Sequence, residues 1–182
     1  MSGHGQQRQR RDGGPAPWVA PVAGATGAAL AVVGSLLTWG EVTHPAWGDQ
    51  EIAGLDGDGV WTLWLAVGAL VLFLATPLAR LPLLAAVAGV LSVGTVALSG
   101  LNAFGPDRSA RIYVRDVLGR GGEDEDEIFA LLSDYGSAPG VWLVLATSVL
   151  SVTAAVWTVV QAGQLLPVAE EMRLRDGELA KR

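Results

Sequence analysis

The acidic residues at positions 54–59 are the first candidates for chemistry. Asp56 and Asp58 lie there in the string Gly-Leu-Asp-Gly-Asp-Gly. An Asp-x-Asp-Gly order resembles the start of a calcium-binding loop, which also needs further oxygen ligands and a distal bidentate Glu. The next residues are apolar and supply no such ligands. We therefore expect a glycine-rich turn in which the Asp58 side chain caps the following helix, with cation binding as the alternative.

An uninterrupted acidic run at residues 123–127 is the second candidate. We expect a solvated helix start, because negative charge suits the positive end of the helix dipole. The alternative is contact with a cation or a basic partner, carried by Glu123, Asp124 and Glu125. His44 has Glu41 and Asp49 near it, but one histidine among scattered acids is expected to be an ordinary loop residue rather than a pH sensor or metal ligand.

Several kinds of chemistry are excluded by composition. The chain has no cysteine, which excludes disulfides, thiolate zinc sites and Cys-ligated iron–sulfur clusters. There is no Ser-His-Asp set, phosphate loop or nucleotide motif. We predict that the protein is not an enzyme and has no catalytic residue, cofactor, metal site or nucleic-acid partner.

The elements that must position these groups are four stretches without any Asp, Glu, Lys or Arg: residues 13–40, 59–79, 81–106 and 135–169. The hydrocarbon core of a bilayer is about 30 Å thick and needs roughly 20 mostly apolar residues to cross as a helix. In lipid, each backbone polar group must find its partner within the segment, which favours helix. We therefore predict an all-α fold, a four-helix transmembrane bundle with a short extracytoplasmic helical hairpin.

The predicted organisation has three parts. A disordered cytoplasmic tail is expected at 1–14, a membrane domain at 15–168 and a second cytoplasmic tail at 169–182. The expected spans are about 18–39, 60–79, 83–104 and 140–166, with the external cap at 105–138. Pro77 and Pro82 are too close to share one regular helix, so a tight turn is expected between spans two and three.

Small residues at four-residue spacing mark the first span, as in Gly24/Ala28 and Gly27/Ala31. Such spacing lets a neighbouring helix approach closely, and the third span is similarly rich in small residues. No charged residue lies inside a span, whereas transporters and proton relays commonly place one there.

The segment 105–138 carries too many apolar side chains for a solvated loop. We expect them to pack on one another, on the first external loop (residues 41–58) or on a partner. The candidate partner-binding residues are Ile112, Val117, Phe129, Leu131, Leu132, Glu123, Asp124 and Glu125.

Orientation follows from the basic residues near the span ends. With the N-terminus inside, the cytoplasmic segments hold eight basic residues and the external loops four. This distribution favours cytoplasmic termini for a multi-pass protein of the plasma membrane. Trp39, Trp61 and Trp142 are then expected at the outer interface and Trp18 at the inner one.

The string at 54–59 before the second span, together with the Arg/Gln/Gly/Pro-rich tail and first span, resembles small, uncharacterised four-span membrane proteins of actinobacteria. Eleven Arg against one Lys also suit a GC-rich actinobacterial genome. The resemblance covers the first two spans best and implies fold and source but no activity. We expect a non-enzymatic accessory or scaffold subunit that binds another membrane protein or itself; the alternative is a channel or a transporter of small solutes or cations.

Overall fold

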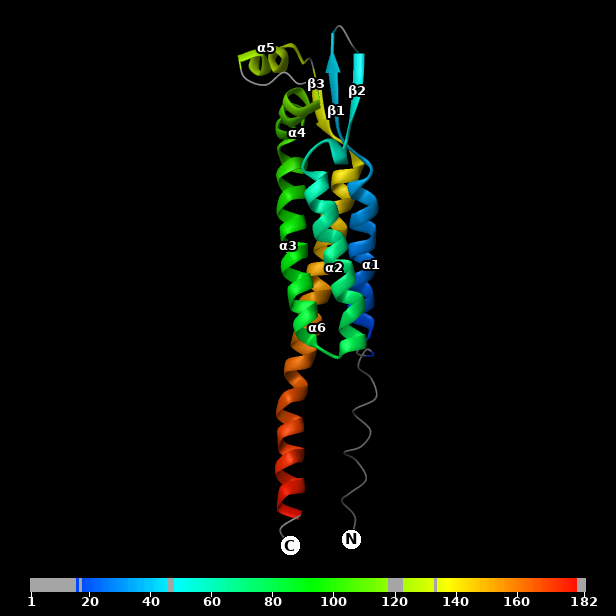
Figure 1. Ribbon diagram of the computed structural model, residues 1–182, viewed down its shortest axis with the longest axis vertical. Helices are drawn as coiled ribbons and strands as arrows, with labels where there is room; N and C mark the ends of the chain where they lie inside the picture. Colours follow the sequence, from blue (N-terminus) through cyan, green and yellow to red (C-terminus); the bar gives the residue numbers. More distant parts are fainter. Residues whose placement is uncertain (1–15, 17, 46–47, 118–122, 133, 180–182) are drawn as a thin grey trace, which may run out of the picture.

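Four helices lie side by side and form the body of the molecule (Figure 1). The computed structural model describes residues 16, 18–45, 48–117, 123–132 and 134–179, so the whole of the expected N-terminal tail (1–14) lies outside the described residues. The helices are α1 (Val19–Ser35), α2 (Gly59–Ala79), α3 (Pro82–Phe104) and α6 (Pro139–Leu179). α1 packs on α2, α2 on α3, α3 on α6 and α6 on α1, which closes the bundle.

Three of these helices are long and apolar enough to cross a membrane. They are α2 with 21 residues, α3 with 23 and the first 26 residues of α6, Pro139–Gln164. α6 continues without a break past the expected end of span four to Leu179 and projects beyond the other helices (Figure 1).

The first helix is shorter than the expected span 18–39, since it ends at Ser35 after 17 residues. The chain leaves the helix through Leu36 and Leu37, and Thr38 already begins a β-strand. Thr38, Trp39, Val42 and Thr43 are β-branched or aromatic, the residue types that favour a pleated, half-buried strand. The charge-free stretch 13–40 therefore contains helix α1 followed by the start of strand β1.

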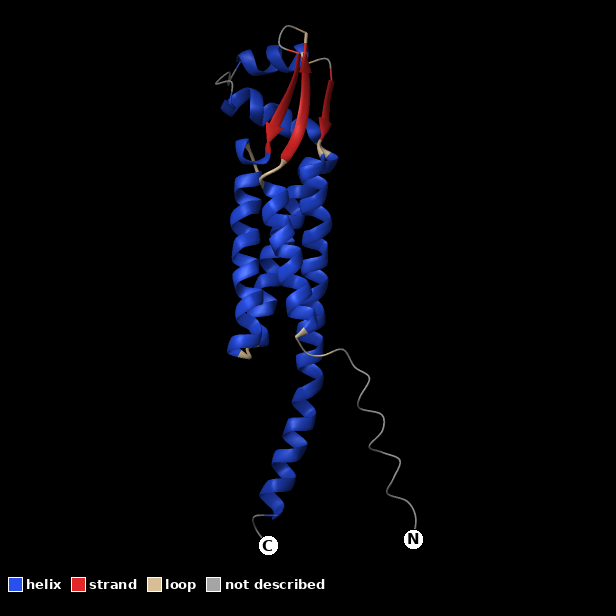
Figure 2. Cartoon of the chain, turned by 90° about the vertical axis from the view of Figure 1, so that its right-hand side faces the viewer, coloured by secondary structure: helices blue, strands red, loops and turns tan. Residues whose placement is uncertain are grey.

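A small antiparallel sheet at one end of the bundle was not predicted, so the all-α prediction is incomplete (Figure 2). The strands β1 (Thr38–His44), β2 (Gly48–Ala53) and β3 (Asp134–Ser137) have the order β2-β1-β3. Val42 in the central strand pairs with Gln50 on one side and with Tyr135 on the other. Residues 41–53, within the expected first loop, are thus mostly strand, and β3 lies within the external cap (105–138), for which a helical hairpin was expected.

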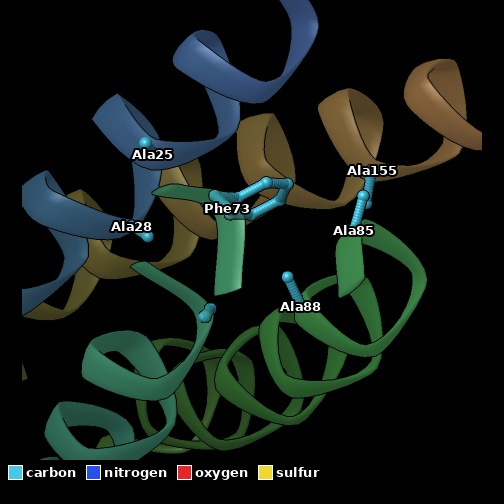
Figure 3. Close-up of a cluster of buried hydrophobic side chains, with 7 residues drawn as sticks. Ala25, Ala28, Phe73, Ala85, Ala88 and Ala155 are labelled. Carbon is cyan, nitrogen blue, oxygen red and sulfur yellow. The ribbon is translucent and has the colours of Figure 1, made fainter. Parts of the chain in front are cut away.

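One part of the bundle interior is filled by a single large ring surrounded by alanines (Figure 3). Phe73 of α2 is 0% exposed and packs in a cluster with alanines of all four helices. The alanines are Ala25, Ala28, Ala69, Ala85, Ala88 and Ala155. Small residues thus let the helices approach closely, and the expected contact faces of the first and third spans are confirmed.

The turn between α2 and α3 is confirmed. α2 contains Pro77 and ends at Ala79, and Pro82 opens α3 at a position where the missing N–H costs little. Arg80 ends α2 in the left-handed conformation, with φ 54° and ψ 31°.

Gly27 provides a direct test of the close packing between α1 and α6. A Cβ atom at Gly27 would lie 2.6 Å from Ser151 Oγ and 2.7 Å from the Thr147 carbonyl oxygen. Since the carbonyl belongs to the helix backbone, Gly27→Ala should push the helices apart and lower the free energy of unfolding by about 1–3 kcal/mol.

Gly163→Ala is the matched control, because no atom lies within 4 Å of the position its Cβ would take. Unfolding by sodium dodecyl sulfate in mixed micelles, followed by circular dichroism, measures both variants. Equal stability of Gly27→Ala and the wild type would contradict this packing.

Candidate functional site

The cap consists of the sheet and three short helices at the same end of the bundle: α4 (Pro106–Ile112), the π-helix η2 (Tyr113–Val117) and α5 (Glu123–Leu131). Val42 of β1, Ile52 of β2 and Ala110 of α4 form a small buried core of its own. Phe129 and Leu132 pack against that core together with Tyr113. The expectation that segment 105–138 packs on the first external loop is therefore confirmed.

The predicted partner-binding residues divide into three groups. Phe129 and Leu132 are half-buried in the cap core, and Ile112 is half-buried beside Gly57. Leu131 is 52% exposed and belongs to the surface. The side chains of Val117, Glu123, Asp124 and Glu125 lie outside the described part of the chain, although their backbone belongs to η2 and α5.

Asp58 stands at the N-cap position of α2, but the prediction that its side chain caps the helix is wrong. Its carboxylate makes no hydrogen bond to the first turn. The Val60 N–H instead donates to the Gly57 carbonyl at 3.3 Å. The turn formed by residues 54–57 supplies that backbone acceptor, which leaves the carboxylate available for other groups.

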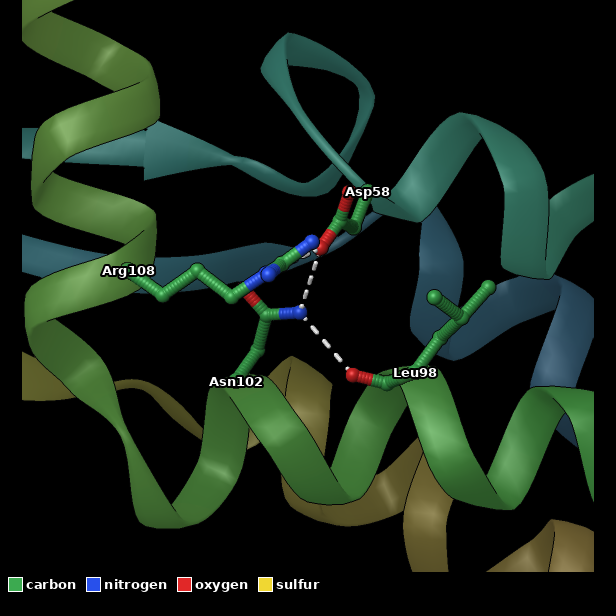
Figure 4. Close-up of polar contacts among 4 residues, drawn as sticks. All are labelled: Asp58, Leu98, Asn102 and Arg108. Carbon is green, nitrogen blue, oxygen red and sulfur yellow. Dashed lines mark hydrogen bonds and ion pairs between the residues drawn. The ribbon is translucent and has the colours of Figure 1, made fainter.

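The Asp58 carboxylate joins three helices (Figure 4). Its Oδ2 accepts a hydrogen bond from Arg108 Nε of α4 at 2.8 Å and one from Asn102 Nδ2 of α3 at 3.0 Å. Asn102 also donates to the Leu98 carbonyl of its own helix at 2.9 Å. We call Asp58, Asn102 and Arg108 the joint, because they connect the start of α2, the end of α3 and the cap.

Charge pairing controls the protonation of the joint. The Asp58 side chain is only 14% exposed, and this burial raises its pKa. The hydrogen bonds from Arg108 and Asn102, with the positive charges of Arg108 and Arg115, lower the pKa by more, so that it lies below its usual value. Hydrogen bonding to Asp58 in turn raises the pKa of the Arg108 guanidinium. The pair is therefore ionised at neutral pH.

Trp39 attaches the start of β1 to the end of α1. It is 3% exposed and its indole Nε1 donates to the Gly34 carbonyl, near the end of α1, at 3.0 Å. The expectation that Trp39 belongs to an interfacial belt is wrong, because the chain turns into β1 and buries the ring. A Cβ atom at Gly54 would lie 2.7 Å from that ring and would also collide with the Ser35 carbonyl oxygen. Gly54 is thus required by this close approach.

The third strand is fixed to the same place. Ser137 Oγ of β3 donates to the Ala103 carbonyl of α3 at 2.8 Å, and the Ala138 N–H donates to the Trp39 carbonyl at 2.9 Å. These two hydrogen bonds attach β3 to the end of α3, and the residue before α6 to β1.

This arrangement suits a structural connection better than binding or catalysis. A cavity beside Asp58 and Asn102 has a volume of about 10 Å³, which is the size of a single water. Within the described ranges, no three His, Cys, Asp or Glu side chains come together in a way that could hold a metal ion. The Asp58 carboxylate is already paired with the Arg108 guanidinium.

Sequence reasoning missed Asn102 and Arg108 as partners of Asp58. One signal was available: Asn102 is the only asparagine in the chain and lies near the end of an apolar stretch. A lone carboxamide there favours a specific hydrogen bond, because burying it without a partner is costly. Comparison with protein-family models, with curated proteins and with solved structures finds no match to the chain.

The joint predicts a specific pH dependence. Because the folded-state pKa of Asp58 is depressed, its stabilisation is complete above the ordinary aspartate pKa of about 3.9 and is lost as the pH falls below it. Asp58→Asn should lower the free energy of unfolding by about 1–3 kcal/mol at pH 7. The difference between wild type and variant should shrink as the pH falls below about 4, as measured by chemical unfolding in detergent.

Asp126→Asn is the control, since Asp126 forms an ion pair with Arg111 at 2.8 Å but its side chain is 83% exposed. Such a surface pair is worth about 1 kcal/mol or less. A wild-type advantage over Asp58→Asn that stays constant down to pH 3 would show that ionised Asp58 does not stabilise the fold.

Proposed function

We propose that this protein is a non-enzymatic, four-span protein of the plasma membrane that acts as an accessory or scaffold subunit. It binds another membrane protein, or a second copy of itself, through the cap, because the small-residue faces of α1 and α3 are already used in contacts within the bundle. The observation that carries the proposal is the joint, which connects a folded cap to a bundle of membrane-spanning dimensions.

Support for membrane embedding comes from the distribution of side-chain size. The interior holds mostly alanine, glycine, serine and threonine, with Phe73, Val141 and Val144, while large apolar side chains cover the outside of the helices. Val90 on α3 is 71% exposed, and Leu74 on α2 and Val156 on α6 are more than half exposed. A surface of this kind is an aggregation hazard in water and suits lipid.

α1 is proposed as the fourth span because it packs against α2 and α6 over the same length of bundle. Its 17 residues are about 25 Å long. Exposed apolar residues at Val22, Leu30 and Val33 continue the outer surface, and Leu36 and Leu37 extend it. The eight-to-four distribution of basic residues then favours cytoplasmic termini and an external cap.

The cap offers residue types that dominate protein interfaces. The Arg111 guanidinium lies 4.2 Å from the centre of the Phe129 ring, and the Phe129 and Tyr135 rings are 5.3 Å apart. Arginine and aromatic residues are enriched in interface hot spots. Leu131, at the end of α5, adds an exposed apolar side chain. Because the cap core holds these groups in place, binding would require little ordering of the surface.

The packing of the bundle gives less support to a channel or transporter. Buried hydroxyl groups mostly donate to carbonyls of their own helix, as Ser92 does to Ala88 and Ser99 to Thr95. Other hydroxyls connect helices, with 2.9 Å between Ser35 and Thr62 and 3.2 Å from Ser151 to the Gly24 carbonyl. These interactions are typical of stable helix contacts, worth about 1 kcal/mol or less each.

Co-purification tests this function. The full chain is extracted in mild detergent, and the proteins that accompany it are quantified by mass spectrometry. Leu131→Ser combined with Tyr135→Ser should reduce partner recovery at least tenfold, since each truncated anchor should cost about 1 kcal/mol or more. The melting temperature should fall only slightly, because Leu131 is 52% exposed and Tyr135, at 38% exposed, loses mainly its ring contact with Phe129.

Leu81→Ser is the matched control at the opposite end of the bundle, where Leu81 is 54% exposed. It should retain the partner. Phe129 and Leu132 are unsuitable for this test because they belong to the cap core. Wild-type recovery of the partner with the double variant, or purification of the wild type as a monomer without companions, would contradict the proposal.

A further inference from the structure

A pocket of about 460 Å³ opens between all four long helices at the end of the bundle opposite the cap. This volume falls within the range of small-ligand sites. Five of the residues that line it carry polar side-chain groups: Trp18 before α1, Thr76 of α2, Arg80 at the end of α2, and Thr158 and Gln161 of α6. None of these residues takes part in the joint or the cap.

The pocket offers hydrogen-bond donors and few acceptors that compete for them. The Thr76 and Thr158 hydroxyls already donate to the Leu72 and Ala154 carbonyls, both at 2.8 Å. Within the described part of the chain, the Arg80 guanidinium, the Gln161 carboxamide and the Trp18 indole N–H have no hydrogen-bond partner. Three such donors on residues that line one pocket favour a ligand whose polar group only accepts hydrogen bonds.

The charge of the pocket favours an anion. Arg80 is the only charged residue between Asp58 and Asp107. No described acidic side chain forms an ion pair with it. Along α6 the first acid after Gln161 is Glu170, nine residues further on, or roughly 14 Å along the helix. A guanidinium at this position is well suited to phosphate oxygens.

The backbone of Arg80 provides an independent observation. Arg80 is the only residue other than glycine with a positive φ in the described ranges. Glycine is the usual residue at such a helix end, and a residue with a Cβ is less stable there by about 1–2 kcal/mol. A strained arginine where glycine would be more stable indicates that its side chain is used.

We propose that this pocket binds the phosphate of an anionic phospholipid from the leaflet opposite the cap. Arg80 pairs with the phosphate, Gln161 and Trp18 donate to its oxygens or to the neighbouring ester, and the apolar walls at Pro77 and Pro82 receive the start of the acyl chains. Among the described residues the pocket has no acid for a choline or ethanolamine group, so the site selects lipids whose headgroup has a net negative charge.

Thermal unfolding of the delipidated full chain in detergent tests the site. The probes are phosphatidylglycerol, phosphatidylcholine and inorganic phosphate, each at the same phosphate concentration. Phosphatidylglycerol should raise the melting temperature of the wild type above the value in phosphatidylcholine, and inorganic phosphate should not. Native mass spectrometry should show at least tenfold tighter binding of the anionic lipid.

Arg80→Gly separates the lipid contact from folding, because it relieves the backbone strain while removing the guanidinium. Its melting temperature without lipid should equal or exceed that of the wild type, and its response to phosphatidylglycerol should fall to that of phosphatidylcholine. Arg173→Gln removes one charge from the later part of α6 and should keep the full response.

Three results would overturn the site: an unchanged phosphatidylglycerol preference in Arg80→Gly, an equal loss in Arg173→Gln, or an equal response to inorganic phosphate. The first two would show that general charge attraction binds the lipid, and the third would indicate a free-phosphate site. The inference rests on the proposed membrane embedding but not on partner binding by the cap, so co-purification and lipid binding can fail separately.

Discussion

A carboxylate removed from most contact with water must find a cation and hydrogen-bond donors, and Asp58 finds both across the boundary between bundle and cap. Its partners belong to the end of α3 and to α4, so pairing the carboxylate also fixes where the cap begins. Ser137 and Trp39 attach the outer and central strands at the same level. The cap core of Val42, Ile52 and Ala110 lies between β1, β2 and α4. The contacts at the joint therefore also fix the position of this core relative to the bundle.

The bundle and the cap pack in different ways. The bundle packs through small side chains around Phe73 and presents its large apolar side chains outward, as expected where lipid supplies no hydrophobic driving force between helices. The cap instead buries large apolar side chains beneath a sheet, as a water-exposed domain does. Polar groups of the bundle and of the cap must be satisfied together where the two meet, and this is where the Asp58–Arg108 ion pair lies, with the side chain of Asp58 14% exposed and that of Arg108 48% exposed.

The helices could be predicted from the sequence because their signals are local. The charge-free stretches anticipated α2, α3 and the apolar part of α6. The glycine and alanine spacing anticipated a close helix contact of α1 but not its partner, α6, and Pro77 and Pro82 anticipated the turn. The sheet could not be predicted in the same way, because β1 pairs with a four-residue strand far along the chain, β3. Asp58 was singled out, but its partners lie 44 and 50 residues away. No local sequence pattern distinguishes an aspartate that pairs with such distant residues from an aspartate that caps its own helix.

The central claim is that cap and bundle form one folded unit connected by the joint. Native-state amide exchange, followed by mass spectrometry in detergent at increasing denaturant, measures this directly. Peptides covering β1 (Thr38–His44) should be protected in the native state and should lose protection together with peptides covering the start of α2 and the end of α3. Near-complete exchange of β1 while both helices stay protected would show that the cap is an independent, loosely attached loop region and would contradict this account.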